Sequence, residues 1–133
     1  MNVRIQNNAQ SILKMNAIFF ERFEYKHIGF KTGESNLNVG FSVVDSIKDD
    51  FMEIKIGFEI CGEELFILNG ELVGQFTVTE KQDISLNQLK TNAIAIMFPF
   101  LRSQITLLTS QPSLVPIVLP PININKVLES QMR

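Results

Sequence analysis

Few side chains of this 133-residue chain could act as a nucleophile, a general base or a metal ligand. His27 is the only histidine and Cys61 the only cysteine, so one chain cannot assemble a zinc site from these two types of ligand. His27 falls in a stretch where we expect a solvated loop. Glu63 and Glu64 follow Cys61, and neighbouring carboxylates disfavour the thiolate that nucleophilic chemistry needs. We therefore expect no enzyme, no catalytic residue, no metal site and no cofactor.

The glycine spacing and the net charge also argue against binding of phosphates and nucleic acids. Gly57, Gly62, Gly70 and Gly74 show neither the spacing of a phosphate-binding loop nor the Lys-Ser or Lys-Thr pair that follows one. The formal net charge is -2 and the pI is near 5.4, so there is no basic footprint. We expect no nucleic-acid partner.

Carboxylates gather between residues 45 and 64, where Lys48 and Lys55 are the only bases. Such a cluster could dock a basic partner, because complementary charge steers association. It could equally be a solvated sheet face and turn, and the sequence leaves both interpretations open. The candidate docking patch consists of Asp45, Asp49, Asp50, Glu53 and Glu59.

Four stretches alternate between apolar and polar residues, which is typical of half-buried strands. They cover residues 12–25, 37–43, 52–60 and 66–78, and we expect an antiparallel sheet with one buried face. The first stretch places one parity on the buried face and predicts a bulge near Glu21. We expect a charged turn over 45–50, a hairpin turn over 61–64 and a possible bulge at Asn69-Gly70. The apolar residues of that first parity are Leu13, Met15, Ala17, Phe19, Phe23 and Tyr25.

Residues 84–111 predict one long helix that is more apolar than a single small chain can cover. Ser85 and Gln88 have the spacing of a capping box at its start. A surface helix normally shows one apolar stripe, whereas this segment shows two, so we expect the chain's own sheet to cover one and another subunit the other. The first stripe is Leu86, Leu89, Ala93, Ile96 and Phe100; the second is Ile94, Phe98, Leu101, Ile105 and Leu108. The candidate interface residues are Leu89, Ala93, Ile96, Phe100, Ile94, Phe98, Leu101 and Ile105.

Composition supports the expectation of an oligomer. Hydrophobic residues make up 45% of the chain and the mean hydropathy is +0.13, yet no apolar run is long enough to span a membrane. Surplus apolar surface indicates subunit interfaces or an apolar binding surface. The first residues lack the apolar segment of a signal peptide, and a single cysteine suits a reducing compartment. We expect one domain over residues 1–133, with 1–10 flexible, in the cytoplasm and without membrane insertion.

Two segments resemble the signature of the SecB export-chaperone family. They are Phe98-Pro99-Phe100-Leu101-Arg102 and the proline-rich stretch from Pro116 to Ile124. The order of four antiparallel strands, a long helix, a proline-rich linker and a short last helix from about Asn123 to Met132 is also similar to SecB. The resemblance implies an α+β fold and a homotetramer built as a dimer of dimers. It further implies an ATP-independent chaperone that binds unfolded polypeptides and keeps precursors competent for export.

The resemblance also implies where such polypeptide clients would bind. In that family the client groove lies between the loop joining the first two strands, here 26–36, the second strand and the final helix. Carried over by position, the groove residues are Phe23, Tyr25, Phe30, Val39, Phe41 and Leu128. The acidic patch would then dock the SecA motor. Three alternatives stay open: a SecB-like chaperone of a toxin–antitoxin system, an oligomer that binds a small molecule in the same apolar groove, and a purely structural oligomer whose surplus apolar surface is all buried at interfaces.

Overall fold

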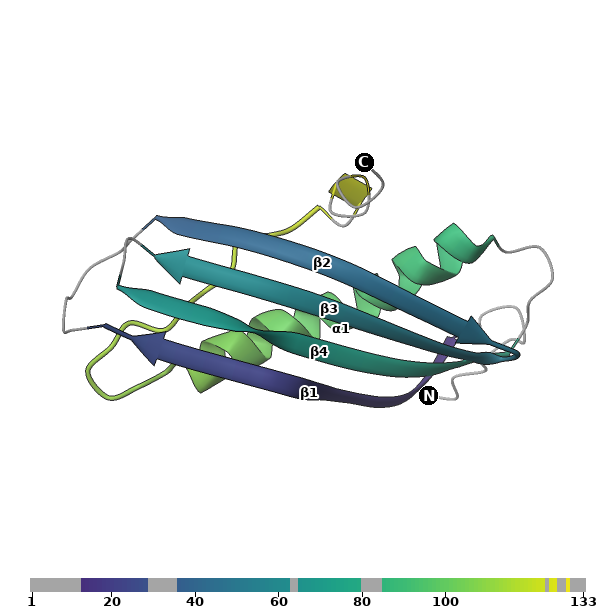
Figure 1. Cartoon of the computed structure of the whole chain (residues 1–133), viewed down its shortest axis with the longest axis horizontal. Helices are drawn as coiled ribbons and strands as arrows, with labels where there is room; N and C mark the ends of the chain where they lie inside the picture. The colour runs from purple at the N-terminus through teal and green to yellow at the C-terminus, as the bar shows by residue number, and fades with distance from the viewer. Residues whose placement is uncertain are drawn as a thin grey trace, which may run out of the picture.

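A four-stranded antiparallel sheet with one long helix across one face forms the described part of the molecule (Figure 1). The computed structural model describes residues 13–28, 36–62, 65–79, 85–123, 125, 126 and 129. The strands are β1 (Leu13–His27), β2 (Leu37–Lys48), β3 (Phe51–Gly62) and β4 (Phe66–Val78), in the spatial order β1-β4-β3-β2, and the helix is α1 (Leu86–Leu108). The predicted antiparallel sheet followed by a long helix is confirmed. We call the sheet face that α1 covers the helix-side face, and the opposite face the outer face.

The two central strands supply most of the core, as their alternation predicts. On β3 and β4 the apolar residues of one parity are buried on the helix-side face, and the residues between them point to the outer face. These buried residues are Met52, Ile54, Ile56, Phe58, Ile60, Phe66, Leu68, Leu72, Phe76 and Val78. Gly74 lets α1 approach β4, because a Cβ there would lie 2.7 Å from Met97 Sδ.

Strand β1 departs from its predicted pattern because it contains two bulges. Its register with β4 shifts between Met15 and Ala17 and again between Phe20 and Arg22, so the predicted bulge near Glu21 is confirmed. Each extra residue exchanges the two faces of the strand. Phe20 consequently packs against the core, whereas Phe19 lies on the outer face and is 44% exposed. The prediction that a single parity of β1 is buried was therefore wrong.

Two further predictions about the strands differ from the structure: the turn after β2 is shorter than expected, and the bulge at Asn69-Gly70 is absent. Strand β2 continues to Lys48, so the turn expected over 45–50 contains only Asp49, with a left-handed φ of 57°, and Asp50. Asp45 stays in the strand, paired with Ile54, so its carboxylate is not part of the turn. The bulge proposed at Asn69-Gly70 was wrong, because both neighbours of β4 pair through these positions without a shift.

Helix α1 begins at the predicted cap and buries most of one face. The Ser85 hydroxyl accepts from the Gln88 N–H at 3.2 Å, which confirms half of the capping box. The helix ends at Leu108, three residues earlier than expected. The second predicted stripe faces the sheet apart from Leu108, whereas the first divides into a buried part and an exposed part. The buried residues of α1 are Leu89, Ala93, Ile94, Met97, Phe98, Leu101 and Ile105.

After α1 the chain returns across the molecule as an extended linker, which we define as residues 115–123. Ile117 and Leu119 of the linker are buried in the core. Figure 1 shows the linker passing behind the strands from the β1 side of the sheet to the β2 side. The last helix expected over 123–132 falls largely outside the described residues, as do residues 1–10 and most of the loop between β1 and β2.

Candidate functional site

Four of the predicted groove residues lie on the helix-side face, two at each edge of the sheet. Phe23 of β1 pairs with Gly70 of β4. Gly70 pairs with Phe58 of β3, which in turn pairs with Phe41 of β2. The adjacent row consists of Tyr25, Leu68, Ile60 and Val39. Three strand spacings separate the two edges, roughly 14 Å. The structure therefore places these residues in register but not side by side, and Phe30 and Leu128 lie outside the described part.

On the β1 edge the predicted groove residues belong to an aromatic cluster. Phe20 packs edge-to-face on Phe23 and on Phe58, with ring centroids 5.2 Å and 5.9 Å apart. The Tyr25 ring stacks on Phe66 at 6.3 Å, and burial raises the pKa of the Tyr25 phenol. The Phe20, Phe23 and Tyr25 rings are half-buried and pack against the buried rings of Phe58 and Phe66. The β1 edge is therefore more a part of the core than an open binding surface.

The β2 edge is less covered. Helix α1 packs mainly on β1, β4 and β3. It reaches β2 through an edge-to-face contact of Phe98 with Phe41 at 5.2 Å, and through an ion pair of 3.0 Å between Lys90 Nζ and an Asp45 carboxylate oxygen. Val39 is 37% exposed. We call the apolar surface formed by Leu37, Val39 and Phe41 the β2 strip.

Sequence reasoning missed Phe58 and Gly70, which connect the two edges. A Cβ on Gly70 would lie 2.8 Å from Phe58 Cζ. Because glycine has no side chain, the Phe58 ring has room to extend toward β1. The Phe58 and Phe23 rings are 6.1 Å apart. One feature of the sequence could have revealed this contact: Gly70 interrupts the alternating series of buried apolar residues on β4.

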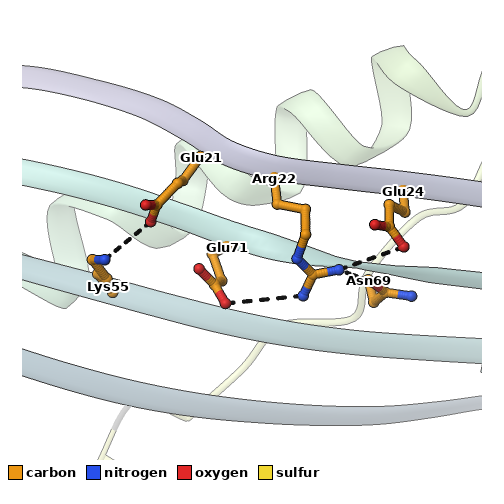
Figure 2. A network of polar contacts seen from close by, with 6 residues as sticks. All are labelled: Glu21, Arg22, Glu24, Lys55, Asn69 and Glu71. Carbon is orange, nitrogen blue, oxygen red and sulfur yellow. Dashed lines mark hydrogen bonds and ion pairs between the residues drawn. The ribbon is translucent and has the colours of Figure 1, made fainter.

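The outer face carries a network of charged residues (Figure 2). Arg22 contacts Glu71 at 3.9 Å and Glu24 at 3.6 Å, and it donates to the Asn69 side chain. The bulge at Glu21 directs its carboxylate over β4 to Lys55 Nζ, 3.0 Å away. That hydrogen bond raises the pKa of Lys55.

The predicted acidic patch is divided among three places. Asp45 points to the helix-side face and pairs with Lys90, whereas Asp49 and Asp50 form the β2–β3 turn. Glu53 and Glu59 lie on the outer face, where Glu53 accepts from the Gln75 amide at 3.1 Å. Near Glu59 the outer face has a depression of about 550 Å³. Its lining residues are Arg22, Gly40, Phe41, Ser42, Gly57, Phe58, Glu59, Asn69, Gly70 and Glu71. The five carboxylates do not form one surface.

Helix α1 keeps an apolar side that the chain's own sheet does not cover. Six of the eight candidate interface residues lie in the core, and the remaining two, Ile96 and Phe100, are 39% and 45% exposed. A depression of about 210 Å³ lies beside them, lined by Ile96, Pro99, Phe100, Ser103 and Gln104. Leu107 continues the same side of the helix and is also exposed. This surface, Ile96, Phe100 and Leu107, is referred to below as the α1 outer stripe.

The described residues bring together no group of three His, Cys, Asp or Glu side chains that could hold a metal ion. Within the same residues, α1 is too polar to count as a membrane-spanning helix. The surfaces available for function are thus the β2 strip, the charged outer face and the α1 outer stripe.

Comparisons with known proteins agree with this description. Among solved structures, the fold is similar to the SecB-like chaperone Rv1957 of Mycobacterium tuberculosis, which was solved in complex with a ChAD peptide from the Rv1956 HigA1 antitoxin. That match has a TM-score of 0.70 and 12% identity, and it covers 84% of this chain and 90% of the other. A protein of unknown function from Streptococcus agalactiae matches with a TM-score of 0.46 and 13% identity, over 82% of this chain and 97% of the other.

The sequence itself gives two further matches. An uncharacterized protein of Methanocaldococcus jannaschii, MJ0357, is 36% identical over 58 residues, which are 43% of this chain and only 37% of that protein. The profile of the family described as preprotein translocase subunit SecB matches residues 8–133, nearly the whole chain. The chain therefore belongs to the SecB family.

Proposed function

We propose that the protein is an ATP-independent chaperone of the cytoplasm that binds non-native polypeptides on the β2 strip. The observation that carries the proposal is the half-covered apolar edge of the sheet, in a chain that belongs to the SecB family. Val39 is exposed, and Leu37 and Phe41 are only partly buried. An apolar edge of this kind suits unfolded chains, whose apolar side chains are not yet buried.

Apolar burial would supply the affinity. A client that covers a few hundred Å² of apolar surface gains several kcal/mol, at about 25 cal/mol per Å², before the cost of ordering it. Strand β2 can add backbone hydrogen bonds, because it is an edge strand whose register with β3 runs from Leu37 to Lys48 without a shift. Backbone pairing does not depend on sequence, which suits a chaperone with many clients. Binding lowers the free concentration of aggregation-prone chain by mass action, so no nucleotide is needed.

A homotetramer, built as a dimer of dimers, is the proposed assembly. The support is the α1 outer stripe, which a single chain leaves in contact with water. A second copy covering Ile96 and Phe100 would bury large side chains that are otherwise nearly half exposed. Several β2 strips on one particle would also raise the effective concentration for a long client.

Two client classes fit, and each has one supporting observation. The family's description as a preprotein translocase subunit supports export precursors, with the SecA motor as a partner. The structural likeness to Rv1957 supports a role beside a toxin–antitoxin system, since that protein was solved with an antitoxin peptide. Affinity purification from the native cells separates the two. Recovery of precursors together with SecA favours the first, and recovery of one antitoxin favours the second.

An aggregation assay with matched variants tests the chaperone and its surface. The wild type at equimolar concentration should suppress aggregation of a chemically unfolded client. Val39→Asp should reduce that protection about tenfold or more, because it places a charge on the β2 strip. Val44→Asp is the control, since Val44 is on the same strand but lies on the outer face and is 63% exposed.

Three results would count against this proposal. Wild-type protein that does not suppress aggregation of the client would contradict the chaperone function. Equal loss in both variants would remove the β2 strip as the site. An ordered small molecule bound on the strip, combined with no effect on aggregation, would favour the small-molecule alternative.

A further inference from the structure

The linker is attached to α1 along one edge by three side chains. The Thr109 hydroxyl accepts from the Ile117 N–H at 2.8 Å, and the Thr106 hydroxyl donates to the Ile117 carbonyl at 2.8 Å. Arg102 donates to the Leu119 carbonyl at 3.2 Å. The three residues are spaced by four and three positions, so they lie on one side of the helix. Helix side chains thus satisfy linker backbone groups that no strand of the sheet pairs with.

The arrangement reproduces the pairing pattern of a β-strand. In an extended chain, the N–H and C=O of one residue and of the second residue after it point to the same side. The Ile117 N–H, the Ile117 carbonyl and the Leu119 carbonyl all point toward α1. The Ile117 and Leu119 side chains then share one face and enter the core, whereas Val118 between them is 62% exposed. Arg102 and Thr106 of α1, together with Thr109 at its C-terminal cap, therefore act as a substitute partner strand for the linker.

This clamp opposes a one-residue shift of the linker in either direction. Pro116 in place of Ile117 would offer no N–H to Thr109. If Val118 took the place of Ile117, the side chains of Ile117 and Leu119 would point out of the core. Thr109 is fully buried and donates its own hydroxyl proton to the Ile105 carbonyl at 2.7 Å, so its free lone pairs are committed to accepting. Losing the linker N–H would leave that buried oxygen without its donor.

We infer that Arg102, Thr106 and Thr109 are positioning residues for client binding, an inference that rests on the proposed function. The linker carries the chain to the β2 side of the sheet (Figure 1), and it leads there into the helical residues Asn125 and Lys126. Holding Ile117 and Leu119 in place fixes where those residues lie relative to β2. The clamp thereby defines one boundary of the surface on which a client lies beside the β2 strip.

A distance measurement tests the clamp itself. Spin labels on Val44→Cys and Lys126→Cys, in a Cys61→Ser background, report the separation of β2 from the chain that follows the linker. The variant Arg102→Met with Thr106→Val removes two of the clamp's three donor or acceptor groups and keeps the apolar parts of both side chains. We expect a narrow distance distribution in the parent and a broad one in the variant. An unchanged distribution would overturn the clamp.

Client affinity tests the functional half of the inference. With a reduced, carboxymethylated unfolded protein as the probe, the double variant should bind about tenfold more weakly, the effect of losing one or two net hydrogen bonds. Thr106→Ser, which restores the hydroxyl, should return the affinity of a Thr106→Val single variant to the parental value. Thr91→Val is the control, because the Thr91 hydroxyl bonds within α1, to the Asn87 carbonyl at 2.8 Å.

The outcomes separate the inference from the proposed function. A broadened distance with unchanged affinity would overturn the positioning role. A parent protein that binds no unfolded client would overturn the proposed function, and the distance measurement would still decide whether the three residues hold the linker. If the double variant does not fold, Thr106→Val alone serves both measurements, since Thr106 is only partly buried.

Discussion

Gly70 lies where β1, β4 and the Phe58 ring meet, and these neighbours leave no room for a side chain. A Cβ would approach the Arg22 backbone carbonyl too closely, and it would lie 2.8 Å from Phe58 Cζ. We expect Gly70→Ala to lower the free energy of unfolding by about 2 kcal/mol, the usual cost of overpacking a core. Urea unfolding followed by circular dichroism measures the change.

Gly40→Ala is the matched control for this prediction. Gly40 lies on β2, and the nearest atom to its added Cβ is the Glu59 carbonyl oxygen at 4.0 Å. Alanine there should change stability by less than about 1 kcal/mol, or raise it by restricting the unfolded chain. Similar losses in both variants would mean that the contact with Phe58 is not what requires glycine at position 70.

Period-two alternation predicts the face of each residue only while the register is unbroken. It was sufficient for β3, where Ile54, Ile56 and Ile60 are fully buried as expected. It failed on β1, where the sequence indicated the bulge near Glu21 but not the one between Met15 and Ala17, which depends on how the edge strand pairs with β4. The same limit applies to the candidate site. Val39 and Phe41 were placed on the correct face, but the Phe58 contact across Gly70 depends on two strands at once.

At the scale of elements, one ion pair joins the helix to the edge strand. Lys90 Nζ of α1 lies 3.0 Å from Asp45 of β2, and the two side chains are only 20% and 30% exposed. A double-mutant cycle with Asp45→Asn and Lys90→Met should give a coupling free energy of about 1 kcal/mol, at the upper end for pairs near the surface. The coupling should shrink as salt is added, because screening weakens exposed charges most.

The pair between Lys55 and Glu21 is the comparison for this cycle. Its distance is also 3.0 Å, but its side chains are 38% and 48% exposed, so its coupling should be smaller. Equal coupling for both pairs would contradict the idea that partial burial strengthens the contact between α1 and β2. A coupling near zero at Asp45 and Lys90 would mean that the ion pair does not hold the helix on the edge strand.

Elements were predicted better than their ends and their contacts. The strands and the helix appear where alternation and the two stripes indicate them. The helix start at Ser85 was specified by a local hydrogen bond, which sequence spacing can reveal. The end of β2 is not specified by local contacts, because Asp45 is held in the strand by pairing with Ile54 and by Lys90 from a distant element. The linker clamp was missed for the same reason, since Thr106 and Thr109 show no pattern until Ile117 lies beside them.

For the whole molecule, the burial of α1 narrows which residues can join subunits. The sequence indicates two apolar stripes, but it does not indicate which one the chain's own sheet covers. In the folded chain Ile94, Phe98 and Leu101 are in the core, whereas Ile96 and Phe100 face outward. An assembly that uses α1 must therefore bury the α1 outer stripe. The proposed tetramer would have four times the 15.1 kDa mass of one chain.

Phe100→Glu should dissociate the proposed tetramer without unfolding the subunit. The ring is 45% exposed in the single chain, so its replacement leaves the core intact, while a carboxylate buried between subunits would cost several kcal/mol. Light scattering should show a smaller particle, with circular dichroism unchanged. Phe19→Glu is the control, because Phe19 is similarly exposed, at 44%, but lies on the outer face of the sheet. A wild-type particle of 15.1 kDa at micromolar concentration would contradict the proposed assembly altogether, because the α1 outer stripe would then stay exposed to water.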